Sequence, residues 1–236
     1  MEDDQSDDVI KHKHIRWLPL EGNPEVWNKI VHANGVDPSY SYTDVYGFEP
    51  ELLAMIPRPV RAIIFLFPLT PNYEKFKEEE EARLTKLEQS LSPDVIFFEQ
   101  TVENACGMIA LLHSLANNED IVGPGLFKRI IEEARDLSPE ERAVVLENST
   151  ELAQIHQTCA QDGQTHVPDI NEDVDLHFIT FIVADNHLYE LDGRKVFPIN
   201  HGKCTDLGAA KVMKQYMALD PDQTNYSAIA LTKTPE

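Results

Sequence analysis

One β-hairpin constrains the fold of this chain most tightly. Residues 174–183 are almost continuously apolar, which is typical of a strand that is buried on both faces. The dipeptide Asp185-Asn186 is a two-residue turn signal, and residues 187–191 form the returning strand. A two-residue turn fixes the partner of every residue in the hairpin, because a slip of one residue would move each side chain to the opposite face. The segment therefore predicts a central antiparallel pair with a defined register.

The predicted register brings a histidine and an aspartate together. It places Ile179 opposite Asp192, so that His177 is the diagonal neighbour of Asp192 on the same face, about 7–8 Å away by backbone. A histidine inside an apolar strand needs a partner for its ring N–H. The pair therefore either satisfies a buried histidine or orients a catalytic one, and the hairpin by itself leaves both interpretations open.

A cysteine near a helix start supplies a candidate nucleophile. Asn104 is a favourable N-cap, and residues 105–116 carry apolar side chains at helical spacing. Cys106 would then lie in the first turn, where the positive end of the helix dipole stabilises a thiolate. Considered alone, such a cysteine is more often an inert buried residue. With His177 and Asp192 it completes the set of a thiol hydrolase, in which the thiolate attacks, the imidazole moves the proton and the carboxylate holds the imidazole.

Dense local matches make the sequence similar to one enzyme family from Arg16 to about Leu231. It resembles the ubiquitin carboxyl-terminal hydrolases, which are small papain-like cysteine proteases of the deubiquitinating system, and in particular their short, single-domain cytosolic isozymes. The local papain signature is absent, so the likeness to papain itself is one of fold and roles. The matching blocks are residues 16–21, 23–26, 44–47, 50–53, 57–60, 100–107, 138–142, 163–165, 176–178, 190–194 and 197–202.

The resemblance implies roles for four residues. Cys106 matches the family nucleophile, His177 the general base and acid, and Asp192 the carboxylate that orients the imidazole. Gln100 matches the glutamine that stabilises the oxyanion together with the backbone N–H of Cys106. Without the resemblance, Gln100 would be interpreted as an ordinary exposed loop amide. Neither a cofactor nor a metal is implied.

The fold class follows from the mixture of elements. Strands and helices alternate without a strict βαβ repeat, so we expect an α/β (α+β) protein with a mainly antiparallel sheet and helices on both faces. The resemblance adds a papain-like arrangement and a knotted backbone, against the usual rule for chain connections. The predicted strands span residues 60–67, 95–98, 174–183, 187–191 and 226–231. The predicted helices span residues 24–34, 72–89, 105–116, 126–134 and 205–219, and two more begin at Pro50 and at the capping box of residues 138–141.

One domain accounts for nearly the whole chain. The 236 residues, 42% of them hydrophobic, can build a single sizeable core over residues 14–236. We expect residues 1–13 to be a disordered tail, and His12 and His14, in or next to this tail, are weak candidates for metal binding. Residues 155–173 are polar with little periodicity and are expected to form a long loop, either a plain surface loop or a lid. The resemblance identifies them as the crossover loop that spans the active-site cleft and restricts leaving groups to small or unfolded ones.

The charge balance restricts the partners. A net charge of −21 argues against nucleic acid and anionic membranes. No run of roughly 18 apolar residues and no signal peptide is present, so we expect no membrane association. The three dispersed cysteines argue for a reducing compartment, which we take to be the cytoplasm with the nucleus as an alternative, and we expect a monomer.

An acidic chain suits a basic partner. Ubiquitin, the ligand that the resemblance implies, ends in a flexible tail with arginines before its terminal glycines, and acidic residues beside the cleft would steer that tail. Glu21, Glu25 and Asp44 are candidates because they lie in matching blocks. Residues 78–81 form a run of glutamates that we interpret as a solvated helix face. Most of the excess charge serves solubility, so the pattern requires none of these contacts.

The predicted function is hydrolysis at the carboxyl-terminal glycine of ubiquitin through a thioester intermediate, with release of small adducts or short extensions. One alternative is a ubiquitin-binding protein that buffers free ubiquitin with weak turnover. The other is a hydrolase for a close ubiquitin-like modifier. The complete set of four residues argues against an inactive protein but not against a slow one.

Overall fold

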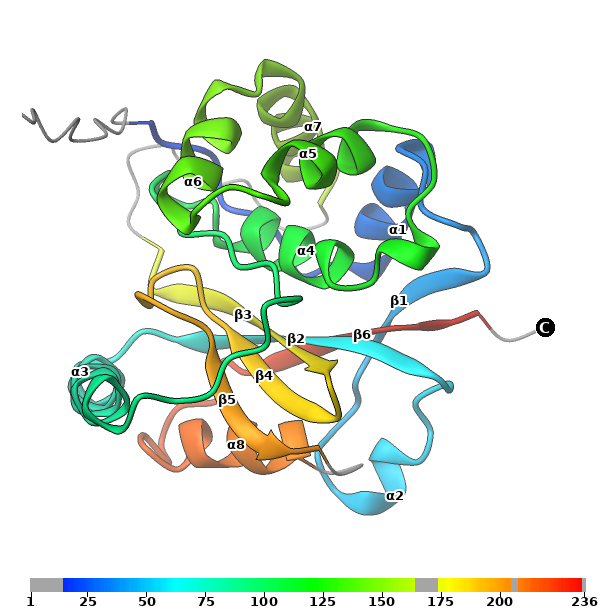
Figure 1. The fold of residues 1–236 in the computed structure, drawn as a ribbon. Helices are drawn as coiled ribbons and strands as arrows, with labels where there is room; N and C mark the ends of the chain where they lie inside the picture. The colour runs from blue at the N-terminus through cyan, green and yellow to red at the C-terminus, as the bar shows by residue number, and fades with distance from the viewer. Residues whose placement is uncertain (1–14, 164–173, 205–207, 235–236) are drawn as a thin grey trace, which may run out of the picture.

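An antiparallel sheet of six strands forms the centre of the molecule in the computed structural model, which describes residues 15–163, 174–204 and 208–234 (Figure 1). Its strand order is β1-β6-β2-β3-β4-β5, and every neighbouring pair is antiparallel. The strands are β1 (Tyr40–Asp44), β2 (Val60–Pro68), β3 (Leu176–Ala184), β4 (His187–Leu191), β5 (Ile199–Lys203) and β6 (Ser227–Lys233). The antiparallel sheet confirms the sequence-based prediction, although β1 and β5 were not anticipated.

Helices cover both faces of the sheet, as predicted. They are α1 (Pro24–Ala33), α2 (Pro50–Leu53), α3 (Pro71–Leu87), α4 (Cys106–Ala116), α5 (Leu126–Ala134), α6 (Pro139–Asn148), α7 (Thr150–Gln161) and α8 (Gly208–Met217), with a 3-10 turn η1 (Glu119–Ile121). Helices α1 and α4 to α7 lie on one face, α2 and α8 lie on the other, and α3 lies at one end of the sheet (Figure 1). None of the helices in the described ranges is long and apolar enough to cross a membrane.

Two hydrophobic cores result, one on each face. The central strand β2 contributes to both, because its side chains alternate between faces. Ile64 packs in the core beneath α4, whereas Phe65 and Phe67 pack in the core beside α8. This explains why the sequence of β2 is an almost unbroken apolar run.

Local signals identify the starts of α1 and α6 correctly. The side chain of Asn23 accepts hydrogen bonds from the backbone N–H groups of Glu25 and Val26, and Gly35 adopts a φ of +99° just after α1. Ser138 and Glu141 form the reciprocal capping box at the start of α6. Each such cap stabilises a helix by about 0.5–2 kcal/mol.

The hairpin has the predicted register. Asp185 and Asn186 have φ values of 48° and 61°, the left-handed conformation that a type I′ turn requires at both central positions. Ala184 pairs with His187, and the ladder continues in the same register toward Asp192. The prediction from the turn is therefore confirmed.

Residues 95–98 are buried but do not form the predicted strand. The N–H and C=O of Ile96 bond to the side chain of Asn117, and the N–H of Phe98 donates to Nε2 of His113 at 2.9 Å. Because side chains from α4 and its C-cap satisfy this backbone, no neighbouring strand is needed.

The beginning of the predicted long loop is helical. Helix α7 extends to Gln161, with Leu152, His156 and Cys159 on its buried face. Two of these three buried positions carry a histidine and a cysteine, which hid the helical periodicity. The prediction of a loop is therefore wrong for residues 155–161. Residues 162–163 follow the helix without regular secondary structure. Residues 164–173 of the predicted loop, and the tail with His12 and His14, lie outside the described residues.

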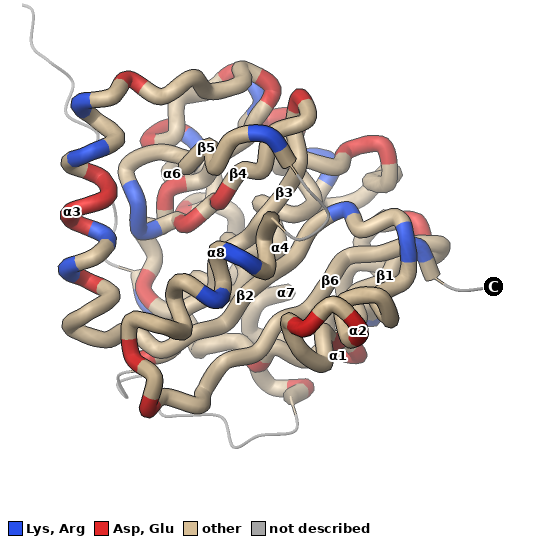
Figure 2. Tube along the Cα trace, turned by 90° about the horizontal axis from the view of Figure 1, so that it is seen from below, with Lys and Arg blue, Asp and Glu red and all other residues tan. Residues whose placement is uncertain are grey.

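The glutamate run of α3 is only partly a solvated face. Figure 2 shows acidic and basic residues interspersed along this helix, and residues 78–79 are exposed as expected. Glu80, however, accepts a hydrogen bond from Lys195 Nζ at 2.9 Å, and Glu81 accepts one from the backbone N–H of Val196 at 3.1 Å. Half of the run therefore holds α3 against the segment that follows β4.

Candidate active site

Cys106 is the first residue of α4 and is half-buried. The predicted N-cap is wrong, because Ala105 occupies that position and no side chain caps the helix. Asn104 has a φ of 59° and donates its side-chain amide to the carbonyl of Trp17 at 3.1 Å, which ties the loop to the N-terminal segment instead. The first-turn N–H groups of α4 therefore have no side-chain cap and remain suited to stabilising negative charge at Cys106.

His177 and Asp192 form a short hydrogen bond in a buried position. Nε2 of His177 lies 2.6 Å from Oδ1 of Asp192, and the two residues are 2% and 1% exposed. The predicted pairing of these side chains is thus present. Because Nε2 is committed to the carboxylate, Nδ1 is the ring nitrogen left to exchange a proton with a nucleophile.

The charge state of this pair follows from its surroundings. Burial alone would lower the pKa of His177, but the charge of Asp192 and its hydrogen bond, with a smaller contribution from Cys106, raise that pKa to about 9. Burial would raise the pKa of Asp192, but the charge and hydrogen bond of His177 hold it well below its usual range. An imidazolium beside a cysteine is the charge arrangement with which thiol hydrolases generate a thiolate.

A hydrogen bond between α4 and β3 aligns the cysteine with the histidine. The hydroxyl of Thr180 donates to the carbonyl of Ala110 at 2.8 Å. Cys106 lies one helical turn before Ala110, and His177 lies near the start of the strand that carries Thr180. The contact therefore fixes the start of α4 relative to the start of β3.

Gln100 is joined to the segment that follows Asp192. Its backbone N–H donates to the carbonyl of Gly193 at 2.8 Å, and its side-chain amide donates to the carbonyl of Val102 at 3.2 Å. A Cβ on Gly193 would lie only 2.9 Å from Cβ of Gln100, so a side chain at this position would force the two segments apart. Gln100 is therefore a half-buried residue of the site rather than an exposed loop amide.

Two further groups bind the Asp192 carboxylate and were not predicted. The hydroxyl of Tyr73 donates to Oδ2 at 2.6 Å, and the backbone N–H of Arg194 donates to Oδ1 at 2.9 Å. The sequence predicts a helix over residues 72–89 but gives no signal for the partner of Tyr73. It gives none for Arg194 either, because a backbone N–H is present in every residue except proline.

The three candidate ubiquitin contacts lie on other segments than those that carry His177 and Asp192. The side chain of Glu21 lies against Gly163, just beyond α7. Glu25 is exposed in the first turn of α1, and Asp44 is exposed at the end of β1. Their roles stay predictions.

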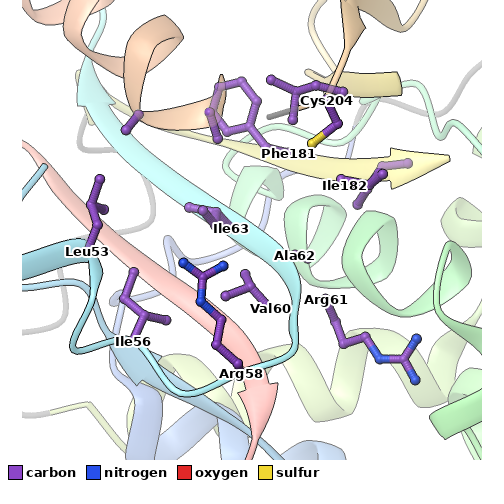
Figure 3. Close-up of a pocket in the computed structure, with 14 residues that line it drawn as sticks. Leu53, Ile56, Arg58, Val60, Arg61, Ala62, Ile63, Phe181, Ile182 and Cys204 are labelled. Atoms are coloured by element: carbon purple, nitrogen blue, oxygen red, sulfur yellow. The ribbon is translucent and has the colours of Figure 1, made fainter. Parts of the chain in front are cut away.

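An apolar cavity of about 180 Å³ lies elsewhere in the molecule (Figure 3). It is lined by residues of β2, β3 and α8, including Ile63, Phe181 and Ala209, with Arg58 beside it. Neither Cys106 nor the His177–Asp192 pair contributes to its lining, so it is separate from the candidate active site.

Known sequences provide an independent comparison. The family described as "Ubiquitin carboxyl-terminal hydrolase, family 1" matches residues 17–218. A ubiquitin carboxyl-terminal hydrolase of Drosophila melanogaster is 44% identical over 223 residues, which cover 92% of this chain and 98% of the relative. The human ubiquitin carboxyl-terminal hydrolase isozyme L1 is 39% identical over 222 residues, covering 91% of this chain and 97% of the relative.

A solved structure has the same fold. The UCH37 catalytic domain of Trichinella spiralis, bound to ubiquitin vinyl methyl ester, superimposes with a TM-score of 0.71. The match covers 93% of this chain and 96% of that domain at 19% sequence identity. At this level of identity the likeness supports the fold, and the sequence relatives support the family.

Proposed function

Because the chain belongs to ubiquitin carboxyl-terminal hydrolase family 1, a family of cysteine proteases, we propose that Cys106 cleaves bonds at the carboxyl-terminal glycine of ubiquitin. The observation that carries the assignment is the buried His177–Asp192 hydrogen bond at the start of β3, aligned with the start of α4. The hydrogen bond orients His177 as the proposed base, and the proposed nucleophile Cys106 is the first residue of α4.

The reaction has two halves that share one tetrahedral geometry. In the first, the thiolate of Cys106 attacks the glycine carbonyl carbon while the imidazolium of His177 gives its proton to the leaving amine, alcohol or thiol, which leaves a thioester. In the second, His177 takes a proton from water, the hydroxide attacks the thioester carbonyl carbon, and the tetrahedral intermediate expels the Cys106 thiolate. The ubiquitin carboxyl group loses its proton to solvent, so the thiolate and the imidazolium are restored. Asp192 keeps the imidazole oriented and balances its charge throughout.

The oxyanion needs donors that are already in place. The side-chain amide of Gln100 and the backbone N–H of Cys106 are the groups that we assign to it. Loss of one such donor typically lowers the rate by about 10²–10³. The hydrogen bond between Gln100 and Gly193 supports this assignment, because it places the glutamine beside the same segment that carries Asp192.

The substrates that fit this proposal are small adducts and short or unfolded extensions of ubiquitin. Glu21, Glu25 and Asp44 are proposed to attract the basic tail of ubiquitin, in keeping with a net charge of −21. We further propose a monomer that acts in the cytoplasm or nucleus without binding nucleic acid or membrane.

The proposal is tested by comparing two substrates with the same fluorogenic carboxyl-terminal amide, one built on ubiquitin and one on a close ubiquitin-like modifier. Rapid turnover of the ubiquitin substrate alone is the expected result. Tight ubiquitin binding with very slow turnover would indicate a buffering protein instead. Preferential cleavage of the modifier would assign the chain to that modifier.

A further inference from the structure

The carboxylate of Asp192 is held on both of its oxygens. Oδ1 accepts from the ring of His177 at 2.6 Å and from the backbone of Arg194 at 2.9 Å, whereas Oδ2 accepts from the hydroxyl of Tyr73 at 2.6 Å. The first two donors lie on or beside the catalytic hairpin. Tyr73 comes from α3, more than a hundred positions earlier in the chain, and is the side chain that holds the second oxygen.

The ring of Tyr73 is fixed in the position from which it donates. Tyr73 is 2% exposed, and its backbone N–H is capped by Thr70 Oγ1 at 3.1 Å. Its ring packs edge-on against Phe67 at 4.7 Å between centroids and against Tyr216 at 5.7 Å. Phe67 in turn packs edge-on against the ring of His177 at 5.8 Å. The phenol is therefore part of the same packed unit as the catalytic histidine.

The hydroxyl acts only as a donor. Burial, followed by the negative charge of Asp192, raises the pKa of Tyr73 well above its ordinary value. The phenol therefore keeps its proton at neutral pH and donates it in the hydrogen bond to the Asp192 carboxylate.

Helix α3 also holds the segment after Asp192. Glu74 pairs with Arg194 at 2.8 Å, and Glu80 pairs with the buried Lys195 at 2.9 Å. These contacts follow one another along α3 in the same order as along the segment. Tyr73 thus stands at the end of a row of polar contacts that fixes the backbone around Asp192, while its own hydroxyl fixes the carboxylate.

We propose that Tyr73 is a positioning residue for the hydrolysis: its hydroxyl fixes the rotation of the Asp192 carboxylate, so that Oδ1 stays directed at His177. The proposal rests on the proposed function, because it assigns Tyr73 a role in the same reaction. In the part of the chain that the structure describes, the hydroxyl of Tyr73 bonds to Asp192 and makes no hydrogen bond to Cys106 or Gln100, so its effect on the reaction passes through Asp192.

The sharpest test removes only the hydroxyl. Tyr73→Phe is expected to lower kcat by about 10- to 100-fold, the range that corresponds to loss of a hydrogen bond to a charged group, while KM and ubiquitin affinity stay unchanged. Tyr42→Phe is the matched control. Tyr42 is equally buried, and its hydroxyl shares a hydrogen bond with the hydroxyl of Ser114 at 2.6 Å, away from the catalytic pair. It is expected to change stability but not kcat per folded molecule.

A double-mutant cycle separates positioning from a general structural effect. If Tyr73 acts through the Asp192 carboxylate, Tyr73→Phe should have little further effect on kcat in an Asp192→Asn background. An equal loss in both backgrounds, or a kcat within twofold of the wild type for Tyr73→Phe alone, would overturn the proposal. A failure of the proposed function would look different, since the wild-type protein itself would then not cleave the ubiquitin amide.

Discussion

Two histidines of this molecule are both buried, but one is positively charged and the other is neutral. His177 in β3 is 2% exposed, and His113 in α4 is 0% exposed. Asp192 raises the pKa of His177 to about 9, despite burial. Burial lowers the pKa of His113 to about 3, and its Nε2 accepts a hydrogen bond from the backbone N–H of Phe98. One ring is therefore an imidazolium at neutral pH and the other is a neutral acceptor.

The difference shows that burial lowers the pKa of a histidine and that a charged partner such as Asp192 can outweigh burial. A carboxylate favours the protonated ring, whereas a backbone donor needs a free lone pair and thus a neutral ring. His156 in α7 resembles His113 in that burial lowers its pKa to about 4, although its Nε2 donates to the backbone carbonyl of Leu18 and a neutral carbonyl does not outweigh burial. Of these three histidines, His177 is the one prepared for proton transfer.

Removing the group that His177 serves should give the largest effect. Cys106→Ala is expected to reduce hydrolysis of a fluorogenic ubiquitin amide to background, because no nucleophile remains, while ubiquitin affinity changes little. Steady-state rates and calorimetric titration measure the two quantities. Cys159→Ala is the control, since burial raises the pKa of the Cys159 thiol to about 12 and should leave that residue inert. Turnover that persists in Cys106→Ala and is lost in Cys159→Ala would move the nucleophile to Cys159.

Removing the charge that distinguishes His177 should give the next largest effect. Asp192→Asn is expected to lower kcat by about 10³–10⁴, because an amide can favour the wrong ring tautomer and no longer balances an imidazolium. The titration of the His177 ring, followed by NMR, should shift to lower pH. A protein that loses thermal stability but keeps its activity per folded molecule would show that the His–Asp pair is merely structural.

The second histidine, His113, should matter for stability alone. His113→Leu leaves the buried N–H of Phe98 without its acceptor, which is expected to lower the free energy of unfolding by about 1–3 kcal/mol. Urea unfolding gives that value, and kcat per folded molecule should stay near the wild-type level. A large loss of kcat in the folded fraction would mean that α4 transmits the change to Cys106.

The smallest expected effect is a pH dependence of stability with opposite signs for the two rings. The raised pKa of His177 stabilises the fold below about pH 6.5, and this contribution is lost as the pH rises toward 9. The lowered pKa of His113 stabilises the fold above about pH 6.5, and this contribution is lost as the pH falls toward 3. Unfolding free energies across this range should decline on both sides. Asp192→Asn should reduce the alkaline decline and His113→Leu the acidic one; the reverse pattern would contradict these assignments.

The sequence predicted those parts of the site that depend on short-range geometry. The Asp185-Asn186 turn determines a register, and the register brings His177 and Asp192 together without any knowledge of the rest of the fold. Helix starts at Pro24 and Pro139 were equally predictable, because their capping side chains are local.

Features that depend on distant partners were missed or misassigned. Residues 95–98 looked like a strand, but side chains from α4 and its C-cap satisfy their backbone groups. Asn104 looked like a helix cap, but it bonds to Trp17. Tyr73 meets Asp192 only because α3 packs against the end of the sheet. In each case the deciding contact joins segments whose proximity no local pattern encodes.

The position of β6 makes the order of synthesis matter for this enzyme. The last strand of the chain pairs with β1 on one side and with β2 on the other, and β2 in turn pairs with β3, which carries His177. A ribosome releases Cys106 and the catalytic hairpin before Ser227–Lys233, so during that interval one edge of β2 has no strand beside it. An unpaired apolar strand edge is a site for aggregation. A chain that stopped just before β6 would therefore contain every proposed catalytic residue and still lack the strand that joins the first part of the sheet to the second.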